Sequence, residues 1–278
     1  MIGICTDSNA QLPPSLVDRY AIEVVPITVT IDGIEYAEGV DLDADAFYAR
    51  FAGGATPQVS TAQPSPGRFA EAYRRLVDRG ASEIISIHVS ATVSGTLNSA
   101  RLAAGEAPVN VHLVDSGTAS FGVGCCVWEA AEALVDGATV RESIEVAQTL
   151  ARTIGNVFVV GALDLVRQGG RLDPTRSPST DTVPVLSLVE GKVTVIATAS
   201  DLVAATAVMA SYVRAWGTGL KVAIGVADRE GAPLSDALEA ALTNAVEVHE
   251  VLRYRIGPSV GVHTGPGTAG AFFFPTVD

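Results

Sequence analysis

Long apolar runs, paired cysteines and a basic leader are all missing from this 278-residue sequence. No apolar run reaches the roughly 20 residues that a membrane-spanning helix needs. The opening MIGICTDSNAQLPP has neither a basic start nor a long apolar stretch, so no secretory signal is expected. The three cysteines, Cys5, Cys125 and Cys126, form no disulfide framework, and no His or Cys stands at zinc-binding spacing. We therefore expect a cytoplasmic protein with no metal site and no stable membrane insertion.

Positive charge and aromatic side chains are also scarce. Lys and Arg number 18 against 31 Asp and Glu, which gives a net charge of −13 and a pI of about 4.7. This balance argues against nucleic acid as a partner and against an anionic membrane surface. Aromatic residues make up 6% and hydrophobic residues 48%, so the core is built mostly from Ala, Val, Leu and Ile. Such a core could enclose an apolar ligand.

Short β-rich runs alternate with helical segments through the first 150 residues. The runs IGIC, EIISIHVS and VNVHLVDS indicate buried strands, and the segments between them have the apolar spacing of helices. This alternation predicts an α/β domain with a largely parallel sheet and helices on both faces. A hairpin turn is expected at Asp32-Gly33.

The pattern changes after about residue 150. Strand-like runs such as VPVLSLVEGKVTVIAT, which contains a hairpin signal at Glu190-Gly191, alternate with two helical segments. We expect an N-terminal α/β domain over residues 1–150 and a C-terminal α+β domain with mixed or antiparallel pairing over residues 151–278.

Two loops of the first half carry hydrogen-bonding groups. Segment 59–66, VSTAQPSP, ends where a helix begins, and the free N–H groups there suit an anion. A plain helix cap at Ser65 explains the same letters and is locally preferred. Ser94-Gly95-Thr96 follows a strand, where ligands bind in open α/β sheets, but a simple helix start is equally compatible. A catalytic serine is disfavoured because no G-x-S-x-G elbow occurs.

Two strings of the second half could present a cation to an anion. Arg171 follows a double glycine and could offer its guanidinium fork to a carboxylate or phosphate, although an exposed arginine after a helix cap is the commoner outcome. His263 is expected at the end of a strand before a Gly-Pro-Gly turn, and a lone histidine there is more often structural. Asp7 is expected to cap a turn at the sheet edge, and His88 is expected to be structural.

The order of these motifs along the chain resembles the DegV family. TDS, QPSP, SGT, a VDS after a strand, GGR and a terminal H-x-GPG follow one another across nearly all 278 residues. The resemblance implies two α/β domains that bind one long-chain fatty acid between them. It also implies a non-catalytic carrier, with no other cofactor, that is similar to the carrier subunit of bacterial fatty-acid kinase and presents the carboxylate to a separate ATP-binding subunit.

The resemblance also implies which residues contact the ligand. Three of them, Thr61, Ser94 and His263, would hold the carboxylate. Gly95 and Thr96 would lie alongside, and Arg171 would support the carboxylate or the phosphorylated product. A buried acyl chain contributes about 10 kcal/mol gross at roughly 0.8 kcal/mol per methylene. Its carboxylate cannot be buried without donors of this kind.

The sequence departs from the family pattern at three places. Ala62 follows Thr61 where a second hydroxyl is common, and Val183 precedes Pro184 where a lysine is common. The stretch from Val193 to Ala205 has no Lys or Arg. These departures favour an alternative, a lipid-binding or sensing protein without a kinase partner. A stand-alone hydrolase that uses Ser94 and His263 ranks below both.

Overall fold

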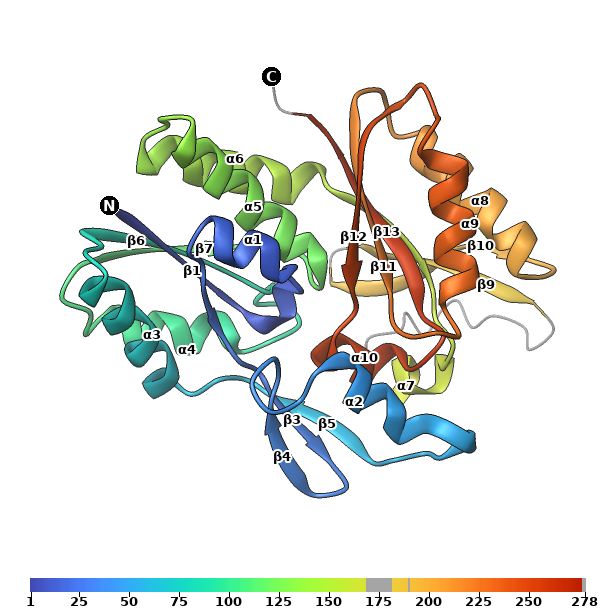
Figure 1. Cartoon of the computed structure of the whole chain (residues 1–278), viewed down its shortest axis with the longest axis horizontal. Coiled ribbons are helices and arrows are strands. Elements are labelled where there is room, and N and C mark those ends of the chain that lie inside the picture. Colours follow the sequence, from blue (N-terminus) through green and yellow to red (C-terminus); the bar gives the residue numbers. More distant parts are fainter. Residues whose placement is uncertain (169–181, 190, 277–278) are drawn as a thin grey trace. The chain divides into compact units, whose positions relative to one another are not determined.

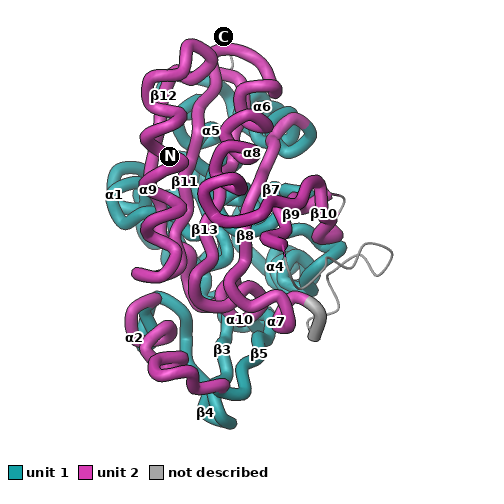
Figure 2. The backbone as a smooth tube through the Cα atoms, turned by 90° about the vertical axis from the view of Figure 1, so that its right-hand side faces the viewer, with its two compact units in different colours: residues 1–43, 57–152 teal, residues 44–56, 153–278 magenta. Residues whose placement is uncertain are grey.

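The computed structural model describes residues 1–168, 182–189 and 191–276. The chain divides into two compact units, coloured separately in Figure 2. Unit 1 comprises residues 1–43 and 57–152, and unit 2 comprises residues 44–56 and 153–278. The chain therefore leaves unit 1 for a short segment and returns to it before it continues into the rest of unit 2. The expected domain boundary at residue 150 stays a prediction.

A four-stranded parallel sheet forms the centre of unit 1. The strand order is β2-β1-β6-β7, with β1 at Ile2–Asp7, β2 at Glu23–Val25, β6 at Glu83–His88 and β7 at Asn110–Asp115. β1 and β6 are almost wholly buried, because a parallel sheet is covered on both faces and its central strands can be apolar throughout. The predicted α/β fold with a parallel N-terminal sheet is confirmed.

Helices cover this sheet on both faces (Figure 1). Helices α3 (Pro66–Asp78) and α4 (Thr96–Ala104) lie on one face, where Tyr73 packs in a core with Cys5 and Ile84. Helix α5 (Phe121–Val135) covers the other face. The remaining helices of unit 1 are η1 (Ser8–Ala10), α1 (Pro14–Arg19) and α6 (Val140–Thr153), the last of which ends at the unit boundary.

Helix α3 shows how local sequence sets an element. Ser65 is its N-cap and accepts a hydrogen bond from the backbone N–H of Arg68 at 3.4 Å, and Pro66 occupies the first helical position, where its missing N–H has no consequence. Phe69, Tyr73 and Leu76 fall on one face and are buried. Each of these side chains contributes about 2 kcal/mol through burial. The helix cap predicted at Ser65 is confirmed.

A separate three-stranded antiparallel sheet, in the order β4-β3-β5, also involves unit 1. Its strands are β3 (Thr28–Ile31), β4 (Ile34–Ala37) and β5 (Val59–Ala62). Asp32 and Gly33 have φ values of 49° and 83°, which is the conformation a two-residue hairpin turn requires. The Asp32 carboxylate accepts a hydrogen bond from the Gln58 N–H at 2.9 Å, which ties the turn to the chain entering β5. The predicted hairpin is confirmed.

Unit 2 is built on a six-stranded sheet in the order β10-β9-β8-β13-β11-β12. The strands are β8 (Gly155–Val159), β9 (Val183–Val189), β10 (Lys192–Ala199), β11 (Leu220–Val226), β12 (Val248–Arg255) and β13 (Ala269–Pro275). β11 and β12 run parallel, while the other paired strands are antiparallel. The expected α+β character is therefore confirmed, as is the β9–β10 hairpin, whose residue 190 lies outside the described residues.

Helices α8 (Leu202–Arg214) and α9 (Ala232–Leu242) cover one face of this sheet and share its main core with β11 and β13. Two short helices, α7 (Leu163–Gln168) and α10 (Pro258–Thr264), lie close together (Figure 1). Next to α10 lies the segment that leaves unit 1, which forms α2 (Ala44–Tyr48) and η2 (Ala49–Gly54). A Cβ built on Gly261 would stand 2.6 Å from atoms of both Phe47 and Tyr48. The close approach of α2 to α10 therefore depends on this glycine.

Candidate functional site

The QPSP and SGT segments, far apart in the sequence, meet within unit 1. Gln63 follows β5, and its side-chain amide donates to Ser99 Oγ at 3.3 Å in helix α4. A Cβ built on Gly95 would stand 1.9 Å from Gln63 Oε1. The Gln63 amide thus occupies the space that a side chain at position 95 would need. This contact brings the loop after Thr61 against the loop that carries Ser94.

The hydroxyls of Ser94 and Thr96 form a compact polar group at the start of α4. Ser94 Oγ lies 2.8 Å from Thr96 Oγ1 and accepts the Thr96 N–H at 3.3 Å. Ser94 is half-buried and Thr96 is buried, and Gly95 is the N-cap residue between them. Thr61 lies on β5 opposite Val29 and is also half-buried. Hydroxyls and helix N–H groups of this kind suit a carboxylate oxygen.

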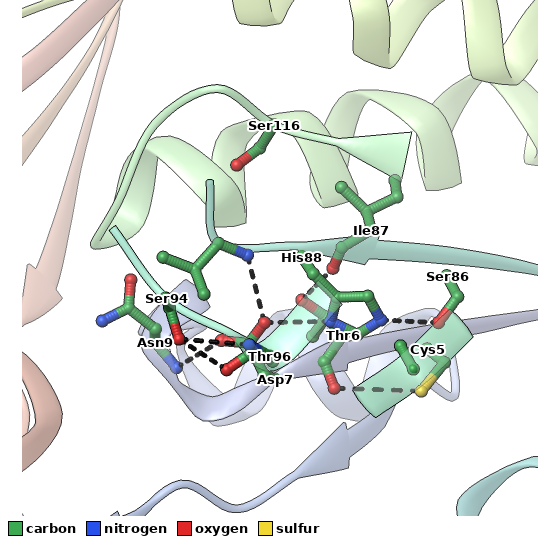
Figure 3. A network of polar contacts seen from close by, with 12 residues as sticks. Cys5, Thr6, Asp7, Asn9, Ser86, Ile87, His88, Ser94, Thr96 and Ser116 are labelled. Carbon is green, nitrogen blue, oxygen red and sulfur yellow. Dashed lines mark hydrogen bonds and ion pairs between the residues drawn. The ribbon is translucent and has the colours of Figure 1, made fainter. Parts of the chain in front are cut away.

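A series of hydrogen-bonded, buried polar side chains lies near Ser94 and Thr96 (Figure 3). Ser86 Oγ lies 2.6 Å from His88 Nε2, and His88 Nδ1 lies 2.9 Å from Asp7 Oδ2. Tyr73 Oη continues the series at 3.0 Å from Ser86 Oγ. All four residues are at most 1% exposed.

We assign a proton to His88 Nδ1, because every donor in this series of side chains then has an acceptor. Tyr73 donates to Ser86, Ser86 donates to Nε2, and Nδ1–H donates to the Asp7 carboxylate. Asp7 also accepts the Asn9 N–H at 3.1 Å, so its predicted turn cap is confirmed. Its bonds to His88 and to the Val89 N–H, at 3.1 Å, were not foreseen from the sequence.

The strand predicted to end at His263 is wrong: His263 lies in the last turn of helix α10. Gly257 caps this helix and Pro258 takes its first position, which favours a helix start. The backbone then closes helical hydrogen bonds from Gly261 N to Gly257 O at 2.9 Å and from Gly265 N to Gly261 O at 2.8 Å. The helix ends at Gly265, whose φ of 75° disfavours other residues.

One carboxylate that the sequence analysis missed organises the Gly-Pro-Gly turn after His263. Asp228 Oδ1 accepts N–H groups from Glu230, Gly231 and Gly267 at 3.1, 3.2 and 2.9 Å. From the other side, a Cβ on Gly161 would stand 1.9 Å from Pro266 O, so the turn sits directly on the backbone after β8. An aspartate at the start of the sequence DREG is typical of a turn. The local sequence does not indicate that this aspartate also accepts the Gly267 N–H.

The structure therefore brings part of the expected site together. In unit 1, the loop after Thr61 and the loop of Ser94, Gly95 and Thr96 are in contact. In unit 2, α10 carries His263, and Asp228 holds the turn that follows this helix. Arg171 lies outside the described residues.

The cysteines offer no competing nucleophile in the described chain. Cys5, Cys125 and Cys126 are all buried. Burial raises the pKa of the Cys126 thiol to about 12 and raises the pKa of Cys5 further, so both stay protonated thiols at neutral pH. Over the described ranges, no group of three His, Cys, Asp or Glu side chains is placed to hold a metal ion. None of the helices in those ranges is long and apolar enough to cross a bilayer.

Comparison with known proteins shows which family this chain resembles. The model for the DegV family, described as uncharacterised proteins, matches residues 1–276. This chain belongs to the DegV family. A DegV domain-containing protein of Streptomyces coelicolor is 34% identical, over 97% of this chain and 96% of its own length. Another from Caldanaerobacter subterraneus is 31% identical over 98% of both.

Solved DegV structures share the fold over the whole chain. The fatty-acid-binding DegV family protein of Thermus thermophilus is 31% identical and superposes with a TM-score of 0.89 over 99% of both chains. A DegV lipid-binding protein of Thermotoga maritima is 25% identical, with a TM-score of 0.86 over 98% of both chains. The fold predicted from the motif order is therefore confirmed as the one that these DegV proteins share.

Proposed function

We propose that this DegV protein binds one long-chain fatty acid and holds its carboxylate through Thr61, Ser94 and His263. The observation that carries the proposal is the full-length likeness to the fatty-acid-binding protein of Thermus thermophilus, at 31% identity and a TM-score of 0.89. In this proposal unit 1 supplies the two hydroxyls and unit 2 supplies the imidazole. That the acyl chain lies between domains 1–150 and 151–278 stays a prediction.

The chemistry of the three donors supports this assignment. A carboxylate removed from water needs hydrogen-bond donors, and charge-assisted bonds to it are stronger than neutral ones. Ser94 Oγ and Thr96 Oγ1 already share one hydrogen bond, at 2.8 Å, so one hydroxyl can donate to the other and leave the second free to donate to a ligand. The acyl chain contributes most of the affinity through its apolar surface.

Loss of a single head-group donor should weaken binding without unfolding the protein. We expect Ser94→Ala and His263→Ala each to reduce the affinity of delipidated protein for palmitate about tenfold, because a hydrogen bond to a charged group contributes about 1.5 kcal/mol or more. Isothermal titration calorimetry measures this loss. The matched control is Ser65→Ala, which removes a hydroxyl that caps α3 and should lower stability by about 1 kcal/mol while leaving the affinity unchanged. Unchanged affinity in both site variants would remove them from the head-group site.

We further propose that the bound carboxylate is presented to an ATP-binding kinase subunit. ATP would then transfer its terminal phosphoryl group to a carboxylate oxygen, giving an acyl phosphate and ADP. The alternative, lipid binding without this partner, is favoured by Ala62, by Val183 and by the absence of Lys and Arg from residues 193–205.

One reaction separates the two proposals. Carrier function predicts that lipid-loaded protein, ATP and a fatty-acid kinase ATP-binding subunit together form acyl phosphate, which hydroxylamine traps. Either component alone should form none. Retained lipid without any acyl phosphate would instead support the alternative.

The hydrolase interpretation has less support. Ser94 is hydrogen-bonded to Thr96, whereas the Ser–His–Asp arrangement that the described residues do contain is Ser86–His88–Asp7, and its side chains are 0% exposed. A substrate cannot reach a serine in that position without opening the core.

A further inference from the structure

The loop that carries Ser94 is held by hydrogen bonds at six consecutive amides, from residue 89 to residue 94. It runs from the end of β6 to the start of α4, and each amide from residue 89 to residue 94 has an acceptor. The pairs are Val89 N to Asp7 Oδ2 at 3.1 Å, Ser90 N to Thr118 O at 2.9 Å, Ala91 N to the Asp115 carboxylate at 3.3 Å, Thr92 N to Ser90 Oγ at 3.2 Å, and Val93 N and Ser94 N to Ser90 O, both at 3.1 Å. The position of the Ser94 hydroxyl follows from these anchors.

Asp7 combines a charged side chain with complete burial, which no other anchor of this loop does. It is 0% exposed, and its two oxygens accept three donors: Asn9 N–H, Val89 N–H and His88 Nδ1–H. Asp115 by contrast is exposed and lies 3.3 Å or more from the Ala91 N–H. Buried charge-assisted bonds are stronger than exposed ones. Asp7 is therefore the firmest of the side-chain anchors on this loop.

The His88 ring is held in one orientation, with Nδ1 facing Asp7, by hydrogen bonds at both of its nitrogens. Ser86 Oγ, at 2.6 Å, holds its Nε2 edge, so Nδ1 points at Asp7. The ring also packs edge-on against Phe69, with centroids 5.0 Å apart and planes at 84°. The end of β1 is thus joined to the end of β6 through a ring whose two nitrogens are both hydrogen-bonded.

We propose that Asp7 is a positioning residue for fatty-acid binding. It fixes the exit of the chain from β6 through the Val89 N–H and the His88 ring, and thereby fixes where the Ser94 hydroxyl meets the carboxylate. Asp7 does not itself touch the ligand. The inference rests on the proposed function and adds to it a residue that acts through the loop.

Two substitutions at Asp7 remove its hydrogen bonds to different extents. Asp7→Ala removes all three acceptor contacts, and Asp7→Asn keeps one carbonyl oxygen, which can still accept the Val89 N–H but has no charge. Ile85→Val is the control, since it removes one methylene from β6, the strand that leads into this loop, without changing a polar contact. Ile85 is 0% exposed, so this control costs stability by ordinary loss of packing.

Amide hydrogen exchange of residues 89–96 without lipid tests the anchoring itself. We expect exchange about tenfold faster in Asp7→Ala than in wild type, and an intermediate rate in Asp7→Asn. Ile85→Val should leave these amides at the wild-type rate relative to the rest of unit 1. If Asp7→Ala does not fold, the comparison of Asp7→Asn with Ile85→Val decides. Exchange in both Asp7 variants equal to that of the control would overturn the proposal.

The effect on the ligand is measured with palmitate labelled with ¹³C at the carboxyl carbon. Its chemical shift reports the hydrogen bonds that the bound carboxylate accepts. We expect Asp7→Asn to move this resonance and to weaken palmitate binding about tenfold, and Ile85→Val to change neither. An unmoved resonance together with unchanged affinity would contradict the positioning role even if the loop exchanges faster. Wild-type protein that binds no palmitate would instead contradict the proposed function, and faster loop exchange would then support the anchor alone.

Discussion

Gly95 has no side chain, and Gln63 occupies the space that one would fill. The distance of 1.9 Å from a built Cβ to Gln63 Oε1 is far below any real contact, so a larger residue must displace the amide. The backbone at Gly95, with φ −77° and ψ 2°, is open to any residue. The glycine is therefore required by contact with Gln63 and not by backbone conformation.

A substitution at this glycine should act through Gln63. We expect Gly95→Ala to lower the free energy of unfolding by about 1 kcal/mol, because the Gln63–Ser99 hydrogen bond is lost, and to weaken palmitate binding. In a Gln63→Ala background the same substitution should cost less, because no amide then has to be displaced.

A double-mutant cycle by chemical denaturation measures this coupling. Gly67→Ala serves as the control, since its Cβ would lie at an ordinary 3.7 Å from Ser65 Oγ in the first turn of α3. Additive effects of the changes at residues 63 and 95 would show that the two loops do not depend on each other.

For single residues, the sequence predicted the side-chain roles whose hydrogen-bond partners lie only a few residues away. Ser65 and Asp7 cap the turns that follow them, and both bonds span two or three residues. The bond from Asp7 to Val89 spans 82 residues, and the bond from Gly267 to Asp228 spans 39. Nothing in the local sequence specifies a partner at such a distance, so these anchors required the structure.

At the scale of elements, the apolar pattern of the sequence predicted the strands, and the residue types at the turns predicted the hairpins. The parallel strands β1, β6 and β7 are apolar runs that end in polar turns, and the Asp32-Gly33 turn requires two positive φ angles that these residues tolerate. Helix α10 was missed because its β-branched residues Val260 and Val262 resemble a strand. The Gly257-Pro258 start outweighs that preference, because proline at the first helical position is already in helical geometry.

Segment 44–56 shows a second limit at the scale of elements. It forms the helix α2, and its grouping with unit 2 was not expected from the sequence. That grouping depends on Phe47 and Tyr48 packing against Gly261, which is more than 200 residues later in the chain. The apolar residues of a short helix indicate that it packs, but they do not indicate against which partner.

For the whole molecule, the order of weak motifs was more informative than any one of them. TDS, QPSP, SGT and H-x-GPG each allow a plain structural interpretation, and together they led to the DegV family, which the match over residues 1–276 confirms. Lipid binding through Thr61, Ser94 and His263 rests on that family and on local geometry within each unit. The proposed kinase step would also require a surface that binds the partner subunit.

The proposed function requires that the molecule hold one long-chain fatty acid. This is measured by native mass spectrometry of delipidated protein incubated with palmitate. We expect a single adduct with the mass of one palmitate per chain, and a long-chain fatty acid in the organic extract of protein purified without delipidation. Protein that shows no adduct with palmitate and yields no long-chain fatty acid on extraction would contradict the proposed function.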